Sequence, residues 1–355
     1  MDPEINSNVK LYLAPMEGIT HAAFREQICS LSEVDYCVTE FMRVTNQLHP
    51  KKVFHRYCPE LFSSKSLVSN PTISSSLQGP LVANKTPIIV QFLGSNKEAL
   101  LANAHRAIEL GAKGIDLNFG CPAKTVNRNQ GGAYLLQFPE LIAEITSYLR
   151  KGLPKEISVS AKIRLGYIDT SLLKDIVSGI DTANLDWLTV HCRTKKNGYA
   201  PPAFWEYLPQ IKEWTKTKVI ANGDIFSVTD LQKCYSISHC KDFMIGRGVI
   251  FNPFLFIEIN KFLTQKKINE PLNSNDIAFF KQPLAPKEVL TLLVNYFELS
   301  EKEVNGYYAT AKVKGWLKTI SIKNSLFKHF FDKMKTLKYP QFQAELYKEY
   351  HEANS

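Results

Sequence analysis

The chain has 355 residues, of which 45% are hydrophobic, enough for one domain of about 250 residues and a smaller one. No apolar run reaches the roughly 18 residues of a membrane span, and the N-terminus lacks the pattern of a secretory signal. The seven cysteines are odd in number and form no CxxC pair, which argues against a disulfide framework or structural zinc and favours a cytoplasmic protein.

Eight short apolar runs, rich in β-branched residues, are predicted as buried strands of a parallel sheet. They span residues 9–15, 35–40, 88–94, 114–120, 157–163, 187–193, 218–224 and 242–248. Helical patterns such as 96–112 and 139–152 separate most of them, and this alternation is typical of parallel strands with helical crossovers. Eight such units favour an α/β fold of the (β/α)8 TIM-barrel type over an open doubly wound sheet, and we predict this barrel for residues 1–262.

Two segments interrupt or end the barrel pattern. Residues 63–87 are rich in serine and proline and are predicted as a surface insertion before the third strand. Residues 263–286 are predicted as a linker. Amphipathic helical patterns follow it and predict a C-terminal all-α helical bundle over 287–355, with Trp316 as an anchor in its core; these patterns lie at 286–302, 307–320 and 324–337.

Positive charge is concentrated in the C-terminal part of the chain. Lys and Arg total 43 and Asp and Glu total 34, a net charge of +9. Residues 281–338 contain eleven lysines and five acids, which accounts for six of those nine charges. This bias indicates a polyanionic partner, most often nucleic acid, although a solvated lysine-rich helical surface explains it equally well.

Polar residues and glycine turns occur at the ends of nearly all predicted strands. Since the carboxyl ends of barrel strands converge on one mouth, these residues predict an active site there. A lysine that ends an apolar strand is costly without a partner, which makes Lys162 hard to explain by packing. The residues are Pro15-Met16-Glu17, Glu40, Gln91, Asn118 with Cys121, Lys162 with Arg164, His191 with Arg193, Asn222-Gly223-Asp224 and Gly246-Arg247-Gly248.

The last two strands end in ANGD and IGRG, which are typical of a phosphate site in a barrel of this kind. Arg247 would add a charge-assisted contact. With Lys162 and Gln91 pointing inward, the pattern favours flavin mononucleotide (FMN), because a lysine stabilises the reduced ring and an amide matches its uracil-like edge. A substrate phosphate in a sugar-phosphate enzyme is the alternative.

Cys121 follows the fourth strand in the turn GCP, and four roles are open to it. A nucleophile would need a lowered pKa and a base, which His191 could supply. A metal ligand would need more partners than the mouth offers. A buried cysteine can also be a small hydrophobe. Beside a reduced flavin, the thiol could protonate one carbon of a polarised C=C bond while the other carbon accepts hydride. Its position at a strand end favours a functional role.

The motifs LAPMEGITHAAFR, TEFMRV, VQFLG, LNFGCPAKTV, AKIRLG, HCRT, VIANGDI and MIGRG occur in this order. Together they resemble the tRNA-dihydrouridine synthases, over nearly the whole chain except 63–87 and the last dozen residues. DYCVTEFMRVTNQLHPKKVFHRYCPEL and VKGWLKTI are most similar to the bacterial branch that modifies uridine 16 of the D-loop. The resemblance implies an enzyme that binds FMN, uses NADPH as reductant and reduces the C5=C6 bond of a uridine in tRNA.

The resemblance also implies a role for individual residues. Cys121 would protonate C5 of the uridine, and Asn118 would face that base. The FMN contacts would be Pro15, Met16, Glu17, Gln91, Lys162, His191, Asn222, Gly223, Asp224, Gly246 and Arg247. Other tRNA contacts would be Arg43, Tyr199, Lys312, Lys314 and Lys335, with the helical bundle as the RNA-recognition domain. No metal and no obligate protein partner are implied, so we expect a monomer.

The chain departs from the family pattern at four positions. Phe119 stands where a smaller residue is usual, Cys192 replaces a glycine, and Asp224 replaces a longer glutamate. Lys312 replaces an arginine, which removes a bidentate donor. Two alternatives to a tRNA enzyme are open. An FMN-dependent barrel reductase of a free pyrimidine or enone would have no use for the lysine-rich bundle, and a non-catalytic RNA-binding barrel would bind no flavin.

Overall fold

The structure is a computed structural model that describes residues 9–62, 80–83, 86–281 and 285–355. Most of the insertion predicted at 63–87 therefore lies outside the described residues. Of its described part, β4 (Leu81–Val82) pairs antiparallel with the first residues of β5 (Thr86–Leu93). The third barrel strand thus begins at Thr86, inside the range predicted for the insertion.

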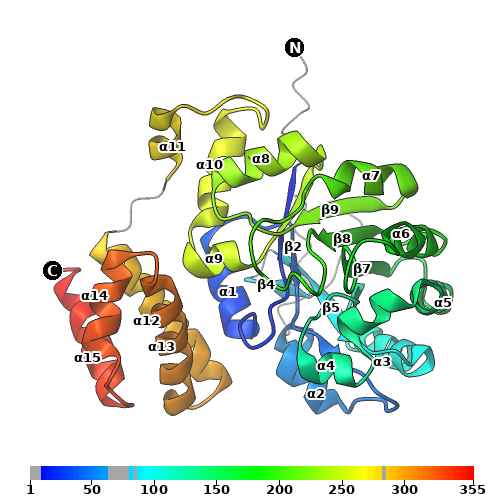
Figure 1. The fold of residues 1–355 in the computed structure, drawn as a ribbon. Coiled ribbons are helices and arrows are strands. Elements are labelled where there is room, and N and C mark those ends of the chain that lie inside the picture. Colours follow the sequence, from blue (N-terminus) through cyan, green and yellow to red (C-terminus); the bar gives the residue numbers. More distant parts are fainter. Residues whose placement is uncertain (1–8, 63–79, 84–85, 282–284) are drawn as a thin grey trace.

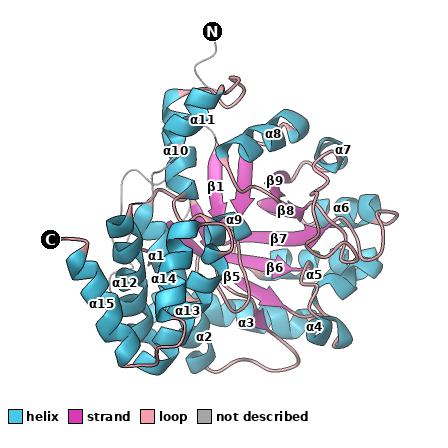
Figure 2. Ribbon diagram, turned by 60° about the vertical axis from the view of Figure 1, so that its left-hand side comes forward, coloured by secondary structure: helices cyan, strands magenta, loops and turns pink. Residues whose placement is uncertain are grey.

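A closed barrel of eight parallel strands forms the centre of the molecule, as predicted (Figures 1 and 2). The strand β1 (Lys10–Leu13) pairs with both β10 (Asp242–Ile245) and β2 (Tyr36–Val38), and β2 pairs in turn with β5, which closes the ring. These strands are buried almost throughout, as strands covered on both faces must be. All eight predicted strands are confirmed: β1 (Lys10–Leu13), β2 (Tyr36–Val38), β5, β6 (Gly114–Asn118), β7 (Ser158–Arg164), β8 (Trp187–His191), β9 (Lys218–Asn222) and β10 (Asp242–Ile245). A two-residue strand, β3 (Met42–Arg43), extends one edge of β5.

Helices surround the barrel and cover its strands (Figure 1). In α5 (Pro139–Gly152), Pro139 occupies the first turn and the buried Ile142, Ile145 and Leu149 share one face. The other helices around the barrel are α1 (Ala22–Leu31), α2 (Lys51–Tyr57), α3 (Lys97–Glu109), α4 (Lys124–Arg128), α6 (Leu173–Asp181), α7 (Tyr207–Trp214), α8 (Val228–Ser238), α9 (Arg247–Phe251) and α10 (Leu255–Gln265), with the 3₁₀ turns η1 (Pro59–Phe62) and η2 (Gly132–Gln137). No helix within the described ranges is long and apolar enough to cross a membrane.

Four helices at the C-terminus pack together beside the barrel: α12 (Pro286–Glu303), α13 (Gly306–Ser321), α14 (Ser325–Met334) and α15 (Gln341–Glu352). The first three match the predicted patterns, and α15 was not predicted. The segment predicted as a linker holds the end of α10 and a short helix, α11 (Ser274–Phe280). The domain boundaries at 262 and 286 stay predictions.

Trp316 has the core position that the sequence predicted. It is only 5% exposed, and its ring packs against Phe24 of α1 and Tyr296 of α12. Its indole Nε1 also donates to the carbonyl of Ile250 in α9, at 3.0 Å. The side chain therefore anchors the bundle to the barrel as well as filling the bundle core.

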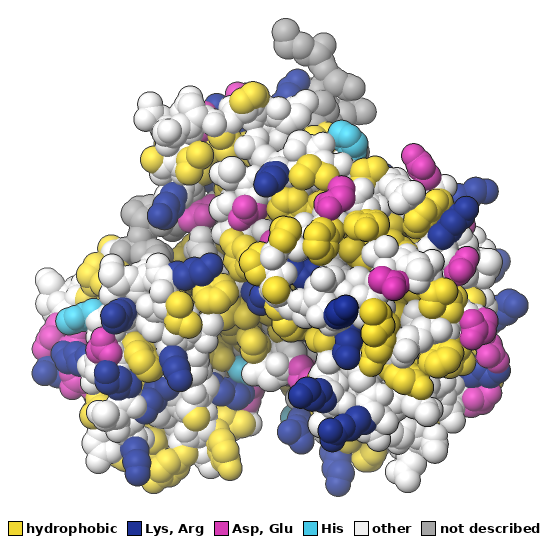
Figure 3. Space-filling model, viewed as in Figure 1, with side chains coloured by type: hydrophobic (Ala, Val, Ile, Leu, Met, Phe, Trp, Pro, Cys, Tyr) yellow, Lys and Arg dark blue, Asp and Glu magenta, His cyan; other side chains and the backbone are white. Residues whose placement is uncertain are grey.

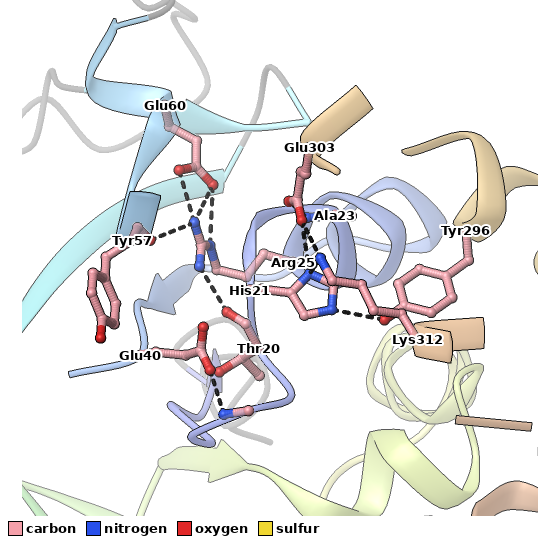
Figure 4. Close-up of polar contacts among 11 residues, drawn as sticks. Thr20, His21, Ala23, Arg25, Glu40, Tyr57, Glu60, Tyr296, Glu303 and Lys312 are labelled. Carbon is pink, nitrogen blue, oxygen red and sulfur yellow. Dashed lines mark hydrogen bonds and ion pairs between the residues drawn. The ribbon is translucent and has the colours of Figure 1, made fainter. Parts of the chain in front are cut away.

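A polar cluster joins the bundle to the first residues of α1 (Figure 4). Glu303, at the end of α12, accepts from the N–H of Ala23 and lies 2.6 Å from Lys312 Nζ and 3.1 Å from His21 Nδ1. The other ring nitrogen of His21 is 2.9 Å from the hydroxyl of Tyr296. Burial would raise the pKa of Glu303, but hydrogen bonds from His21 and Lys312 outweigh it and lower the pKa to about 2. We call these five residues the joint.

Candidate active site

A cavity of about 580 Å³ opens at the carboxyl ends of the strands, within the roughly 300–1,000 Å³ range of small-molecule sites. Ten of the eleven residues predicted to bind FMN line it: Pro15, Met16, Glu17, Lys162, His191, Asn222, Gly223, Asp224, Gly246 and Arg247. Cys121, Asn118 and Tyr199 line it too. Most residues of the predicted site therefore lie together, because the carboxyl ends of the barrel strands converge.

Gln91 is the predicted FMN ligand that does not line the cavity. It is completely buried, and its Nε2 donates to Asp116 Oδ2 at 2.7 Å. Its Oε1 accepts from Asn118 Nδ2 at 2.9 Å, so Asn118 carries the hydrogen-bond network from Gln91 to the cavity wall. Burial raises the pKa of Asp116 to about 6, although Ser160 and Gln91 donate to it. Contact between Gln91 and a flavin ring stays a prediction.

The turn that carries Cys121 is fixed by several hydrogen bonds. Asn118 Oδ1 accepts from the backbone N–H groups of Gly120 and Cys121, at 3.0 and 2.9 Å. The carbonyl of Cys121 accepts from Asn127 Nδ2 and from Ala133 N, both at 3.0 Å. Gly132 has φ of +60°, and a Cβ there would lie 2.9 Å from the Cys121 carbonyl oxygen. Only glycine permits this close approach.

The surroundings of Cys121 favour the protonated thiol. The residue is 9% exposed, beside Phe41, Leu93 and Val126. Burial raises the pKa of the Cys121 thiol, and a hydrogen bond from the Ala123 backbone only partly offsets this rise. A nucleophilic thiolate requires the opposite shift, so the environment favours a proton donor. Nowhere in the described ranges do three His, Cys, Asp or Glu side chains gather in a way that could hold a metal ion.

Lys162 and His191 stand on neighbouring strands and are both pushed toward their neutral forms. Lys162 Nζ donates to Asn222 Oδ1 at 2.9 Å, and Asn222 Nδ2 donates to the Met244 carbonyl at 2.7 Å, which fixes the orientation of the amide. Burial, with the nearby Arg164, lowers the pKa of Lys162 to about 8. Burial and the surrounding cations hold the pKa of His191 well below its usual value. Burial is the main cause at both residues, and the neighbouring cations add to it.

Asp224, which lines the cavity, binds two arginines, Arg247 in the lining and Arg193 buried behind it. Its carboxylate binds Arg193, accepts from Arg247 Nη2 at 3.2 Å and accepts from the N–H of Ala203 at 2.8 Å. The turn depends on left-handed backbone at Gly223 and Asp224, with φ of +123° and +53°. Because a carboxylate repels phosphate, Asp224 is suited to hold Arg247 in place, and Arg247 is suited to meet the anion.

The charge of the cavity lining is positive. The lining includes four basic side chains, Lys124, Lys162, Arg164 and Arg247, and two acidic ones, Glu17 and Asp224, which leaves a net charge of +2 with His191 neutral. A cavity with this surplus and glycine turns along one wall is suited to a phosphate-bearing ligand.

Sequence reasoning gave no role to several residues that shape this site. Arg164 and Arg193 were noted only as residues at strand ends, yet both are completely or almost completely buried. Asp116 carried one signal, a carboxyl in an otherwise apolar strand. Phe41 and Phe226 line the cavity without a sequence signal of their own. Phe119, where the sequence departs from the family, lies in the hydrophobic core and is absent from the lining.

The residues predicted to contact tRNA fall into two groups. Asn118 and Tyr199 line the cavity, whereas the other four do not. Arg43 lies in β3, Lys314 Nζ donates to the Leu337 carbonyl at 3.0 Å, and Lys335 Nζ pairs with Asp332 at 2.7 Å. Lys312 belongs to the joint. Lys and Arg side chains are spread over the visible face of the bundle in the space-filling view (Figure 3).

Comparisons with known proteins agree with the geometry. The profile of the Dihydrouridine synthase (Dus) family matches residues 12–351. Proteins described as tRNA-dihydrouridine(16) synthase are similar over most of their length. The one from Shewanella oneidensis is 38% identical over 87% of each chain, and the one from Neisseria meningitidis serogroup B is 37% identical over 94% of this chain and 92% of its own. The one from Pseudomonas syringae pv. tomato is 41% identical over 71% of this chain and 74% of its own.

A solved structure described as an old yellow enzyme homologue from Zymomonas mobilis covers 78% of this chain and 96% of its own. The identity between the two chains is 11% and the TM-score is 0.43. The family profile alone spans nearly the whole chain, including the barrel and the helical bundle. The chain therefore belongs to the dihydrouridine synthase family.

Proposed function

We propose that the chain is an FMN-dependent tRNA-dihydrouridine synthase that reduces the C5=C6 bond of uridine 16 in the D-loop, with NADPH as the reductant. The observation that carries the proposal is a buried thiol, Cys121, on the wall of a positively charged cavity in a chain of this family; burial raises the pKa of this thiol. Position 16 comes from the names of the relatives and from the sequence resemblance.

The donor set of the cavity fits FMN. Arg247, with the backbone of Gly223 and Gly246, would bind the phosphate, and Asp224 would hold Arg247 in place. Lys162, oriented by Asn222, would be the cation beside the ring. FMN, when bound, supplies the hydride that C6 of the uridine accepts. Pro15, Met16, Glu17, Gln91 and His191 complete the proposed FMN contacts.

Cys121 would supply the second hydrogen of the reduction. Hydride adds to C6 and the proton of the thiol adds to C5, so that the C=C bond becomes a single bond and the thiol becomes a thiolate. Water then returns a proton to the sulfur. Because burial raises the pKa of Cys121, the thiol is protonated at neutral pH before each turnover. Asn118, which holds the turn, would also face the base.

The uridine must leave its stack in the D-loop to reach the cavity, and loop nucleotides do this at modest cost. The half-exposed ring of Tyr199 stands at the mouth and can stack on a base or ribose. We propose that Arg43, Lys312, Lys314 and Lys335 contact the tRNA backbone. Residues 287–355 would form the RNA-recognition domain and residues 1–262 the catalytic domain. A monomer in the cytoplasm stays the prediction.

The test is a nucleotide-resolved map of dihydrouridine in unmodified tRNA after incubation with the purified protein and NADPH. Reduction confined to position 16 is the expected result. Reduction at another D-loop uridine would keep the chemistry and overturn the position. A yellow protein that NADPH reduces but that leaves both unmodified and native tRNA unchanged would favour the reductase of a free pyrimidine or enone.

A further inference from the structure

Arg164, the last residue of β7, binds two separate loops of the cavity mouth. Its Nε donates to the carbonyl of Gly120 at 2.8 Å, directly before Cys121. Its Nη1 donates to the carbonyls of Gly198 at 2.8 Å and Thr194 at 3.2 Å, in the loop after β8. The side chain is 2% exposed, so these carbonyls replace the water that a guanidinium would otherwise bind.

The Gly120 contact completes the restraint on the Cys121 turn. Asn118 accepts from the N–H groups of Gly120 and Cys121 on one side of the turn. Arg164 binds the carbonyl of Gly120 on the other side. Buried side chains thus restrain both ends of the peptide unit between Gly120 and Cys121, and Asn118 and Arg164 together fix the backbone from which the thiol projects.

The second loop carries Tyr199, the exposed aromatic residue at the mouth. The guanidinium carbon of Arg164 lies 5.0 Å from the centre of the Tyr199 ring, and that of Arg247 lies 4.8 Å from it. Because Tyr199 is 51% exposed, packing against protein restrains only part of the ring, and contact with two guanidinium groups orients it. Arg164 thus contacts both the turn that carries Cys121 and the loop that carries Tyr199.

We propose that Arg164 is a positioning residue that fixes the Cys121 turn and the Tyr199 loop relative to each other, so that the thiol and the entering base meet in one geometry. The part of this inference that concerns the base rests on the proposed function. Lysine cannot replace arginine in the role, because three carbonyls in two loops require the planar, forked donor set of a guanidinium.

The first experiment measures the rate at which iodoacetamide alkylates Cys121, read by peptide mass spectrometry. It compares the unchanged, folded protein with the folded variants Arg164→Lys and Arg164→Met. If Arg164 positions the turn, both variants free it, and we expect labelling about tenfold faster in each. If Arg164 acts only by its charge, Arg164→Lys will label like the unchanged protein and Arg164→Met more slowly, since loss of a nearby cation raises the thiol pKa. That result would overturn the proposal.

Arg150 offers a matched control at the opposite end of β7. It also donates to three carbonyls, those of Leu153, Pro154 and Ile157, but it lies before the strand and away from the cavity. Arg150→Lys and Arg150→Met should leave the labelling rate of Cys121 unchanged. Faster labelling in these variants as well would mean that any lost arginine loosens the barrel, and it would also overturn the proposal.

The second experiment separates the two halves of the reaction in rapid mixing. We expect NADPH to reduce the bound flavin at the normal rate in Arg164→Lys, while transfer to tRNA slows by about 10- to 100-fold. Equal losses in both halves would identify a general structural role. Absence of tRNA reduction by the unchanged protein would reject the proposed function, and the labelling experiment would still decide the role of Arg164.

Tyr199→Ala tests the connection by a substitution at an exposed residue. Removal of the ring should speed the labelling of Cys121 in the protein that keeps Arg164. In the Arg164→Met background it should add nothing further, because the two loops are then no longer connected. Independent, additive effects of the two substitutions would contradict a connection through Arg164.

Discussion

The mouth of the barrel and the joint both concentrate charge, but folding disfavours the charged forms of Lys162 and Cys121 at the mouth and favours the charged form of Glu303 at the joint. At the mouth, burial lowers the pKa of Lys162 to about 8 and raises that of the Cys121 thiol, so folding opposes the charged forms. At the joint, burial opposes the charge of Glu303 as well. Hydrogen bonds from His21 and Lys312 outweigh it there and lower the pKa of Glu303 to about 2, so folding favours the carboxylate.

The charges that surround these groups explain the difference between the two regions. In the joint, the Glu303 carboxylate pairs with Lys312 of the bundle and contacts the His21 ring of the barrel, 3.1 Å away. The mouth holds more positive than negative side chains, and its charges would be balanced by an anionic ligand. Charged residues that folding disfavours are expected where function requires them.

The largest effect should come from Cys121→Ala. We expect the rate of dihydrouridine formation to fall by about 10²- to 10⁴-fold, the usual worth of a positioned general acid. Bound flavin, read from its absorbance, should stay at the normal level, because the thiol is not among the proposed FMN ligands. Cys121→Ser should be nearly as slow, since a hydroxyl is a much weaker acid. Normal turnover in the alanine variant would remove the proton-donor role.

The strand ends of this site could be predicted because buried parallel strands need continuous apolar runs, which makes Lys162 and His191 conspicuous where the runs stop. Side-chain direction was harder to predict. Gln91 ends up behind Asn118 because Asp116, a residue of the next strand, binds its amide. The pairing of Asp224 with two arginines depends on the path of a left-handed turn that the sequence does not specify.

The joint could not be predicted because it unites residues far apart in the chain, with a separation of 291 positions between His21 and Lys312. The helices α15 and α11 were not predicted, for different reasons. In α15 only Phe342 and Leu346 are buried, which is too weak a periodic pattern to recognise. In α11 the capping box of Asn273 and Asp276 was a usable signal that the interpretation of the segment as a linker overlooked.

Lys162→Met should stabilise the flavin-free protein while it impairs FMN binding. The pKa of Lys162 is about 8 in the folded chain and 10.5 ordinarily, so its charge costs folding energy below pH 8, and this cost disappears as the pH rises toward 10.5. Each pKa unit corresponds to about 1.4 kcal/mol, and the substitution also loses the hydrogen bond to Asn222. We therefore expect the free energy of unfolding at pH 7 to rise by about 1–3 kcal/mol. Urea unfolding at pH 7 and pH 10 measures it, and a less stable variant at pH 7 would contradict it.

Glu303→Gln should destabilise the protein without touching the chemistry. The pKa of Glu303 is about 2 against an ordinary 4.5, so its contribution is complete above pH 4.5 and is lost as the pH falls toward 2. We expect a loss of about 1–2 kcal/mol at pH 7, discounted because the side chain is 22% exposed, and no loss near pH 2. Glu301→Gln, on the same helix, is the control. Equal losses of stability in both variants would show that the contacts of Glu303 in the joint do not stabilise the protein.

The smallest effect should distinguish the lysines of the bundle. Lys335 is exposed, and its pair with Asp332 costs little to break, so it is available to a phosphate. Lys335→Ala should therefore reduce the slope of log affinity for tRNA against log salt by about one unit or less. Lys312 must first leave Glu303, so Lys312→Met should lower stability more than it changes this slope. Measuring the affinity of both variants for tRNA at several salt concentrations tests these two expectations. An equal change of slope for both would mean that tRNA opens the joint, and that the joint is part of the RNA interface.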